Sequence, residues 1–354
     1  MKIKATYRRY TLYFKQPAGT SRGVYRDKEV YYLFLTANEF MRPGIGECNV
    51  LRGLSYDDRP GYEENLAHLC RKITAGDFDW KDPLCAWPSV RFALDTALAD
   101  LQRGGEHILF PSAFTRGTRG IITNGLVWMD HPERMRNQAE EKIQQGFRCI
   151  KIKIGMHPWA QEHALLANLR SRFASDELCL RVDANGAFRE ENVFSVLDDL
   201  AKLEVHSVEQ PVGANDQKLM AAVCRKSPVA VALDESLIGV CTDPQREALL
   251  DTLKPQFLIL KPALCGGFAA CEKWIALASS KNIGWWATSA LESDVGLNAI
   301  VQWVATKDTL LPQGLGLGNL YTNNVGSPLE LRKEALYYNP DQKWKEQHIQ
   351  PLSL

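Results

Sequence analysis

The 354-residue chain lacks the features of membrane, secreted and nucleic-acid-binding proteins. It has no apolar run of membrane-spanning length, and its basic start, Met1–Tyr10, is not followed by the apolar stretch of a signal peptide. Its 42 basic and 42 acidic residues cancel, so no overall field favours binding to nucleic acid or to an anionic membrane. We therefore expect a cytoplasmic protein with a small-molecule partner. No pattern in the chain specifies an oligomeric state.

Motifs for disulfides, zinc and nucleotides are also missing. The nine cysteines include no C-x-x-C pair and are odd in number, which fits reduced thiols better than a disulfide framework or a zinc site. No G-x-G-x-x-G or P-loop follows a strand-like run. A doubly wound, nucleotide-binding sheet is therefore the less favoured α/β architecture.

The first part of the chain reads as a small α+β domain. Alternating segments at Thr6–Phe14 and Glu29–Leu35 predict an antiparallel sheet, and apolar spacing predicts helices at Tyr62–Ile73 and Ser89–Leu101. We expect this domain to cover residues 1–115 and to be joined by the C-terminal segment 318–354.

From about residue 120 the pattern becomes strand, helix, strand, helix. The polar ends of the apolar runs recur every 25 to 30 residues, which is the spacing of a β/α barrel, here expected over residues 116–317. The expected strands are Ile121–Trp128, Cys149–Ile154, Leu178–Asp183, Val205–Glu209, Val229–Asp234, Phe257–Lys261, Ile283–Ser289 and a weak last one near Gly314–Gly318.

Five consecutive strands end in an ionisable residue, which places these groups on the rim where barrel active sites form. They are Lys153, Asp183, Glu209, Asp234 and Lys261. Three carboxylates from adjacent strands repel one another unless a cation compensates them, and oxygen ligands suit Mg²⁺. The flanking lysines would face each other across this metal, where one could remove a proton next to a substrate carboxylate.

Strict alternation in Cys149–Gly155 places Lys151 and Lys153 on one face, which in a barrel points inward. A solvated edge strand is the ordinary alternative for such a segment. The charged ends of the following strands favour the barrel. A catalytically silent barrel would be expected to lack at least one of these rim groups, and none is missing.

The chain resembles the enolase superfamily and, within it, the muconate-lactonizing-enzyme subgroup. The resemblance implies a (β/α)7β barrel with an N-terminal α+β capping domain. Its motifs are K-x-K at Lys151–Lys153, D-x-N at Asp183–Asn185, Glu209, Asp234-Glu235, Lys261 and S-x-x-E-S at Ser289–Ser293.

Within that subgroup the chain most resembles the o-succinylbenzoate synthase family of menaquinone biosynthesis. This implies syn elimination of water from a hydroxycyclohexadiene carboxylate, with Lys153 as base and acid and Lys261 as a stabilising cation. Mg²⁺, or Mn²⁺ in its place, would be held by Asp183, Glu209 and Asp234. The segment Gln16–Gly23 is expected to be a substrate-closing loop. The expected substrate-binding residues are Lys151, Asn185, Ser289, Glu292, Ser293 and Asn124.

Related activities of the same subgroup remain open alternatives. An N-succinyl amino acid racemase or another epimerase would use Lys153 and Lys261 as a pair of bases. Dipeptide epimerases carry a D-x-D motif on the eighth strand, where this chain has glycines and leucines. This difference argues against a dipeptide substrate but leaves N-succinyl amino acids open.

Overall fold

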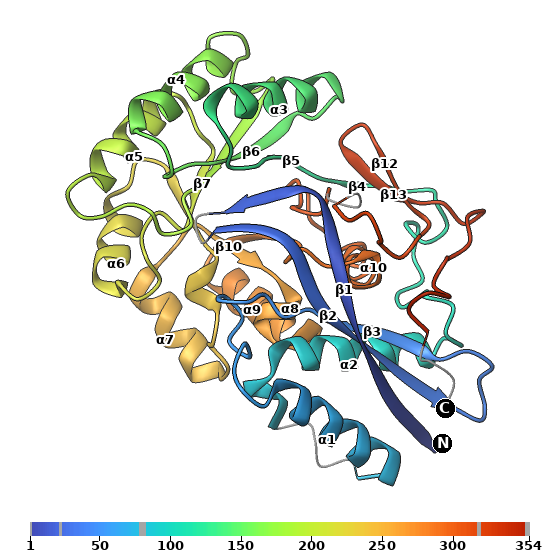
Figure 1. The fold of residues 1–354 in the computed structure, drawn as a ribbon. Coiled ribbons are helices and arrows are strands. Elements are labelled where there is room, and N and C mark those ends of the chain that lie inside the picture. The colour runs from blue at the N-terminus through green and yellow to red at the C-terminus, as the bar shows by residue number, and fades with distance from the viewer. Residues whose placement is uncertain (1, 21–22, 78–82, 317–319, 351–354) are drawn as a thin grey trace.

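The structure is a computed structural model that describes residues 2–20, 23–77, 83–316 and 320–350 (Figure 1). No helix among these residues is long and apolar enough to cross a membrane. The expected fold class is confirmed, because an N-terminal sheet domain lies against a barrel of parallel strands and helices.

The N-terminal domain is built on a long antiparallel hairpin. Strands β1 (Ile3–Thr20) and β2 (Gly23–Ala37) pair along most of their length, and β3 (Gly44–Cys48) adds to β2. Helices α1 (Tyr62–Ala75) and α2 (Pro88–Leu101) cover one face of this sheet, as predicted, and the 3₁₀ helix η1 spans Pro83–Ala86.

Helix α2 lies directly on β3 because a glycine allows the close approach. A Cβ atom added at Gly46 would lie 1.9 Å from the carbonyl oxygen of Ala93, so any larger residue would push the helix away. This packing seals the core of the N-terminal domain.

The segment Gln16–Gly23 is not the loop that was predicted, since its described residues belong to the two hairpin strands. Its role in closing over the substrate stays a prediction. Residues 21 and 22 lie outside the described part of the chain. The hairpin end packs on the barrel, because a Cβ at Gly19 would lie 2.3 Å from the carbonyl oxygen of Met129. Figure 1 shows the hairpin reaching from the N-terminal domain toward the barrel strands.

Seven parallel strands form the barrel sheet in the order β11-β10-β9-β8-β7-β6-β5, so each neighbours the next one in sequence. The strands are β5 (Gly125–Val127), β6 (Cys149–Lys153), β7 (Cys179–Asp183), β8 (Ser207–Glu209), β9 (Ala230–Leu233), β10 (Phe257–Leu260) and β11 (Gly284–Ala287). The connecting helices are α3 (Pro132–Gln144), α4 (Trp159–Arg170), α5 (Val193–Lys202), α6 (Gln217–Lys226), η2 (Glu235–Leu237), α7 (Asp243–Leu253), α8 (Pro262–Cys265), α9 (Gly267–Ser280) and α10 (Asp294–Val304).

The weak eighth strand is reduced to two bridging residues. Gln313 pairs with Thr123 on one side, and Gly314 pairs with Thr288 on the other. Backbone hydrogen bonds from Asn124 to Gln313 (2.8 Å) and from Gly314 to Ala287 (2.8 Å) join the first and seventh strands across this gap. These contacts close the barrel.

The predicted first strand is split in two. Its start, β4 (Ile121–Ile122), pairs with β13 (Ala335–Tyr338), which in turn pairs with β12 (Leu329–Arg332), and only β5 joins the barrel. The segment after these strands reaches the N-terminal domain, since the Trp344 ring lies 4.4 Å from the His107 ring. The division into residues 1–115 plus 318–354 and 116–317 stays a prediction.

The alternation in β6 is as predicted. Ile150 and Ile152 are fully buried in the large apolar core, while Lys151 and Lys153 line a cavity inside the barrel. The inward face of this strand therefore carries charge, and only a polar site can accommodate it.

Candidate active site

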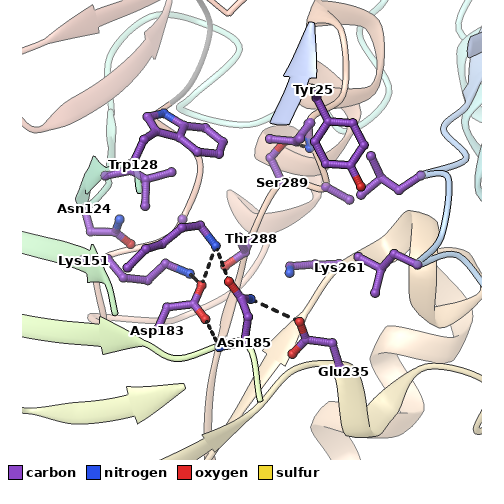
Figure 2. Close-up of a pocket in the computed structure, with 18 residues that line it drawn as sticks. Tyr25, Asn124, Trp128, Lys151, Asp183, Asn185, Glu235, Lys261, Thr288 and Ser289 are labelled. Carbon is purple, nitrogen blue, oxygen red and sulfur yellow. Dashed lines mark hydrogen bonds and ion pairs between the residues drawn. The ribbon is translucent and has the colours of Figure 1, made fainter. Parts of the chain in front are cut away.

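A pocket lies where the carboxyl ends of the barrel strands meet the N-terminal domain. Figure 2 shows Lys151 and Lys261 reaching into it from opposite sides, with Asp183 and Asn185 between them. The pocket is lined by Tyr25, Leu51, Leu54, Asn124, Leu126, Trp128, Lys151, Lys153, Asp183, Asn185, Glu235, Lys261, Thr288, Ser289, Ala290, Leu291, Gly314 and Gly316.

Strand register brings the rim charges together. Lys153 pairs with Asp183, and Asp183 pairs with Glu209, so three neighbouring strands end in charged residues at the same level. Asp234 and Lys261 each directly follow the next two strands. Adjacent parallel strands that end at the same level place their last residues together at one edge of a barrel.

The lysines and carboxylates are connected by buried ion pairs. Lys151 Nζ lies 3.0 Å from Asp183 Oδ2 and 2.8 Å from Glu209 Oε2. Lys153 Nζ lies 3.1 Å from Asp183 Oδ2, and Lys261 donates to Asp234. Each carboxylate therefore has at least one ammonium group as a counterion.

Burial and neighbouring charges shift the acidity of these groups. Burial and the neighbouring charge of Asp183 raise the pKa of Glu209 to about 7. Burial opposes ionisation of Asp183, but the charges of Lys151 and Lys153 outweigh it and hold the pKa of Asp183 below its usual range. Burial raises the pKa of Asp234, although Lys261 opposes that effect.

Lys151 and Lys261 have raised pKa values, because neighbouring carboxylates stabilise their charged forms. Burial alone would lower the pKa of Lys151, but the charges of Asp183 and Glu209 raise it above the ordinary value. Burial likewise opposes the charge of Lys261, yet Asp234 and Glu209 raise its pKa overall. Both side chains are therefore positively charged at neutral pH in this arrangement.

The three carboxylates fit a hard divalent cation by chemistry and by charge. Asp183, Glu209 and Asp234 are each no more than 3% exposed and offer oxygen ligands only, which suit Mg²⁺ better than zinc. Among the described residues, however, no three His, Cys, Asp or Glu side chains form a group that could hold a metal ion as they stand. Lys151 and Lys261 bond the carboxylates instead, so these contacts must rearrange for the three groups to converge.

Two asparagines of the predicted site also reach the pocket. Asn185 Oδ1 accepts from Lys153 (2.7 Å), and its Nδ2 donates to Glu235 (3.1 Å). Asn124 donates to the carbonyl oxygen of Gly125, while its Oδ1 is buried without a hydrogen-bond partner among the described residues. An unsatisfied buried acceptor that lines a pocket favours contact with a ligand.

The strand-seven motif is divided between the pocket and its support. Ser289 lines the pocket, whereas Glu292 and Ser293 do not. Glu292 accepts from the Ser289 hydroxyl (2.5 Å), and the Ser293 side chain accepts from Val295 N at the start of α10. Both side chains are therefore engaged in contacts within the protein, and substrate binding by Glu292 and Ser293 stays a prediction.

Sequence reasoning missed the apolar part of the pocket. Tyr25, Leu51 and Leu54 come from the N-terminal domain, and Leu126 and Trp128 come from and after β5. The period-2 pattern of the hairpin predicts a strand, but it does not indicate which residues lie over the barrel. Glu235, which follows Asp234 in the D-E pair, also lines the pocket and was not among the expected site residues.

Comparison with known proteins places the chain among enolase-like enzymes. The family model described as Enolase C-terminal domain-like matches residues 134–340. The o-succinylbenzoate synthase of Desulfotalea psychrophila is 42% identical over 92% of this chain and 96% of its own length.

Solved structures agree with this placement. The crystal structure of MenC from Desulfotalea psychrophila superimposes with a TM-score of 0.84 at 39% identity and covers 95% of this chain and 100% of its own. A dipeptide epimerase from Enterococcus faecalis, solved with Mg and the dipeptide L-Leu-L-Tyr, gives a TM-score of 0.82 at 20% identity and covers 98% of this chain and 99% of its own. The second likeness concerns the fold alone.

Proposed function

This chain belongs to the enolase superfamily, in its muconate-lactonizing-enzyme subgroup, and from that premise we propose that it is an o-succinylbenzoate synthase. The observation that carries the proposal is the 42% identity to a synthase of that name over nearly the full length of both chains. The reaction is the syn elimination of water from 2-succinyl-6-hydroxy-2,4-cyclohexadiene-1-carboxylate. The product, o-succinylbenzoate, belongs to menaquinone biosynthesis.

In the proposed mechanism Lys153 moves the proton. Its neutral amine takes the proton from the carbon next to the ring carboxylate, and the resulting ammonium then gives that proton to the departing hydroxyl on the same face. The carbon–hydrogen and carbon–oxygen bonds break, and water leaves while the ring becomes aromatic. Lys153 must first release Asp183 Oδ2, which lies 3.1 Å from its Nζ, because the amine has to reach the substrate to act as the base.

Lys261 acts in this proposal as a fixed positive charge. It lines the pocket on a different strand end from Lys153, and its pKa is raised, so it stays protonated while negative charge develops on the substrate. Asn124, Asn185 and Ser289 offer polar contacts to the substrate. Tyr25, Leu51 and Trp128 supply an apolar wall for its ring.

We further propose that Asp183, Glu209 and Asp234 hold Mg²⁺, for which Mn²⁺ can substitute. When bound, the cation would stabilise the negative charge that gathers on the substrate carboxylate after proton removal. The support is the oxygen-only donor set and the raised pKa of Glu209, which burial and then repulsion from Asp183 produce. The proposed partner is accordingly a small carboxylate, with no nucleic acid or membrane involved, and the proposed location is the cytoplasm.

A racemase or epimerase is the second candidate, because two lysines from different strands line the same pocket. Such an enzyme would use Lys153 and Lys261 on opposite faces of an α-carbon. Gly314 and Gly316 line the pocket from the region of the eighth strand, so that region contributes no carboxylate from its described residues to bind a dipeptide ammonium. N-succinyl amino acids are the remaining substrates for this candidate.

One experiment separates the two functions. The purified protein with Mg²⁺ is given the cyclohexadiene substrate in one reaction and N-succinyl amino acids in another. We expect rapid loss of the diene absorbance in the first and slow or no racemisation in the second. Racemisation that is faster than dehydration would overturn the proposed function in favour of the second candidate.

A further inference from the structure

A buried polar cluster joins the N-terminal domain to the barrel beside the pocket. It consists of Lys28 from β2, Glu47 and Asn49 from β3 and the residues after it, and Glu292 and Ser293 from the strand-seven motif. Each of these residues is at most 6% exposed. Burying so many polar groups is costly unless they are paired, so their contacts define how the two domains fit together.

Lys28 and Asn49 hold two consecutive backbone carbonyls of the barrel. Lys28 Nζ donates to the carbonyl oxygen of Leu291 and to Asn49 Oδ1. Asn49 Nδ2 lies 2.9 Å from the carbonyl oxygen of Ala290 and 2.8 Å from Glu292 Oε1. Two side chains of the N-terminal domain therefore fix the peptide groups that follow Ser289.

These peptide groups belong to the pocket wall, and one residue among them, Leu291, is conformationally strained. Ser289, Ala290 and Leu291 all line the pocket, and Leu291 has a φ of 63°, in the left-handed region. That conformation is unfavourable for a residue with a Cβ atom. The surroundings must therefore hold Leu291 in place, and Lys28 and the Tyr321 hydroxyl, 2.6 Å away, both bond its carbonyl oxygen.

Lys28 also balances the buried acids of the cluster. Glu47 accepts from the backbone and side chain of Ser293, and Glu292 accepts from the Ser289 hydroxyl. Burial lowers the pKa of Lys28 to about 8, although the charges of Glu47 and Glu292 oppose that shift. The ammonium form is thus favoured at neutral pH, and its loss would leave two buried carboxylates without that counterion.

We infer that Lys28 is a positioning residue, which fixes the Ser289–Leu291 wall and thereby makes the fit of the substrate depend on docking of the N-terminal domain. Lys28 does not line the pocket itself, so it acts through Leu291 and Asn49. The inference rests on the proposed function in one respect, because it takes the molecule that contacts this wall to be the substrate of the proposed reaction. Lys153 and Lys261 contact none of the five residues of the cluster in the hydrogen bonds of the described chain.

The kinetic test uses Lys28→Met, which removes the ammonium and keeps an unbranched apolar stem. We expect the KM for the cyclohexadiene substrate to rise about tenfold while kcat changes less than about twofold, because wall contacts are lost and the reacting groups are untouched. Lys28→Arg retains the positive charge and the hydrogen-bond donors, so its KM should lie between those of the unaltered protein and Lys28→Met. The exposed Lys4 on β1 provides the matched control, Lys4→Met, which should leave both constants unchanged.

A second measurement does not depend on activity. Hydrogen–deuterium exchange of the peptide covering residues 289–296 should be faster in Lys28→Met, whereas exchange in β6, β7 and β8 should match the unaltered protein. If the unaltered protein shows no dehydration, the proposed function fails, and the exchange result alone decides the role of Lys28. A lower melting temperature with unchanged KM and unchanged exchange in residues 289–296 would overturn the positioning role.

If Lys28→Met does not fold, the inference can be tested with Asn49→Ser, which leaves the charge of Lys28 in place. Asn49→Ser removes the amide that holds the carbonyl oxygen of Ala290 and should raise KM in the same direction by a smaller factor. A folded Asn49→Ser protein with unchanged KM and unchanged exchange in residues 289–296 would also overturn the inference.

Discussion

Lys151 and Glu209 are buried counterions, with Lys151 Nζ 2.9 Å and 2.8 Å from the two carboxylate oxygens of Glu209. The same ammonium lies 3.0 Å from Asp183, so it bridges two of the three proposed metal ligands. A single lysine therefore compensates charges that a divalent cation would otherwise have to balance. This relationship connects the stability of the metal-free barrel to its metal affinity.

Removal of the Lys151 charge should destabilise the metal-free protein. In Lys151→Met, two buried carboxylates lose their shared partner, and we expect the free energy of unfolding to fall by about 3 kcal/mol or more. Urea unfolding at neutral pH in a chelator measures this, and added Mg²⁺ should restore part of the loss. The control is Lys202→Met, whose loss of the exposed pair with Asp199 should change the free energy of unfolding far less than Lys151→Met does. Equal losses in the two variants would contradict this reading of Lys151.

Activity should depend on a divalent cation. We expect chelation to abolish dehydration and Mg²⁺ or Mn²⁺ to restore it, because the single charge of Lys261 does not balance the negative charge that gathers on the substrate carboxylate. Asp183→Asn, Glu209→Gln and Asp234→Asn should each weaken Mn²⁺ binding measured by titration calorimetry. Full turnover by a rigorously metal-free preparation would refute the metal proposal.

The two proposed catalytic lysines should respond unequally to substitution. Lys153→Ala and Lys153→Arg should both lose essentially all dehydration, because a guanidinium group remains protonated and cannot act as the base. Lys261→Ala should lose its charge and its activity, whereas Lys261→Arg should keep a measurable fraction. Single-turnover rates of folded, metal-loaded variants measure this difference. Comparable losses in the two arginine variants would argue against the proposed division of roles.

Two-base chemistry predicts a different result for the same variants. Either single substitution would then stop racemisation, while the remaining lysine could still exchange the α-proton of one enantiomer with D₂O. Exchange followed by NMR with N-succinyl amino acids therefore distinguishes a racemase from a dehydratase.

The pH dependence of stability should reflect His107. Its Nδ1 lies 3.2 Å from Asp100 Oδ2, and its Nε2 lies 2.5 Å from Glu346 Oε2. Burial alone would lower the pKa of His107, but the hydrogen bonds to Asp100 and Glu346 raise it to about 9. Because this pKa is higher in the folded state, the stabilisation is fully present below about pH 6.5 and is lost as the pH rises through about 9.

Unfolding free energies at about pH 6 and above pH 9 test this expectation. The shift corresponds to roughly 3 kcal/mol, so the unaltered protein should lose about that much more stability than His107→Gln over this interval. The exposed His131 gives the control variant, His131→Gln, which should behave like the unaltered protein. An identical pH profile for His107→Gln and the unaltered protein would show that His107 is not the source.

Much of the barrel could be predicted because its local patterns are strong. Apolar runs such as those ending at Asp183 and Glu209 have the length and spacing of buried parallel strands, and β7 and β8 form where they were expected. The eighth strand, expected near Gly314–Gly318, was located only approximately, and residues 317 and 318 lie outside the described part of the chain. It is held by single bridges at Gln313 and Gly314, which leave almost no periodic signal.

The sequence by itself determined which charges gather at the strand ends, since period-2 alternation and parallel order place Lys153, Asp183 and Glu209 at one edge. Only the tertiary structure decided what lies opposite them. Tyr25 and Leu51 enter the pocket through docking of the N-terminal domain, and Lys28 reaches Leu291 across 263 positions of the chain. Such contacts depend on how two separately folded surfaces fit together, and a local pattern of residues carries no information about a partner so distant in sequence.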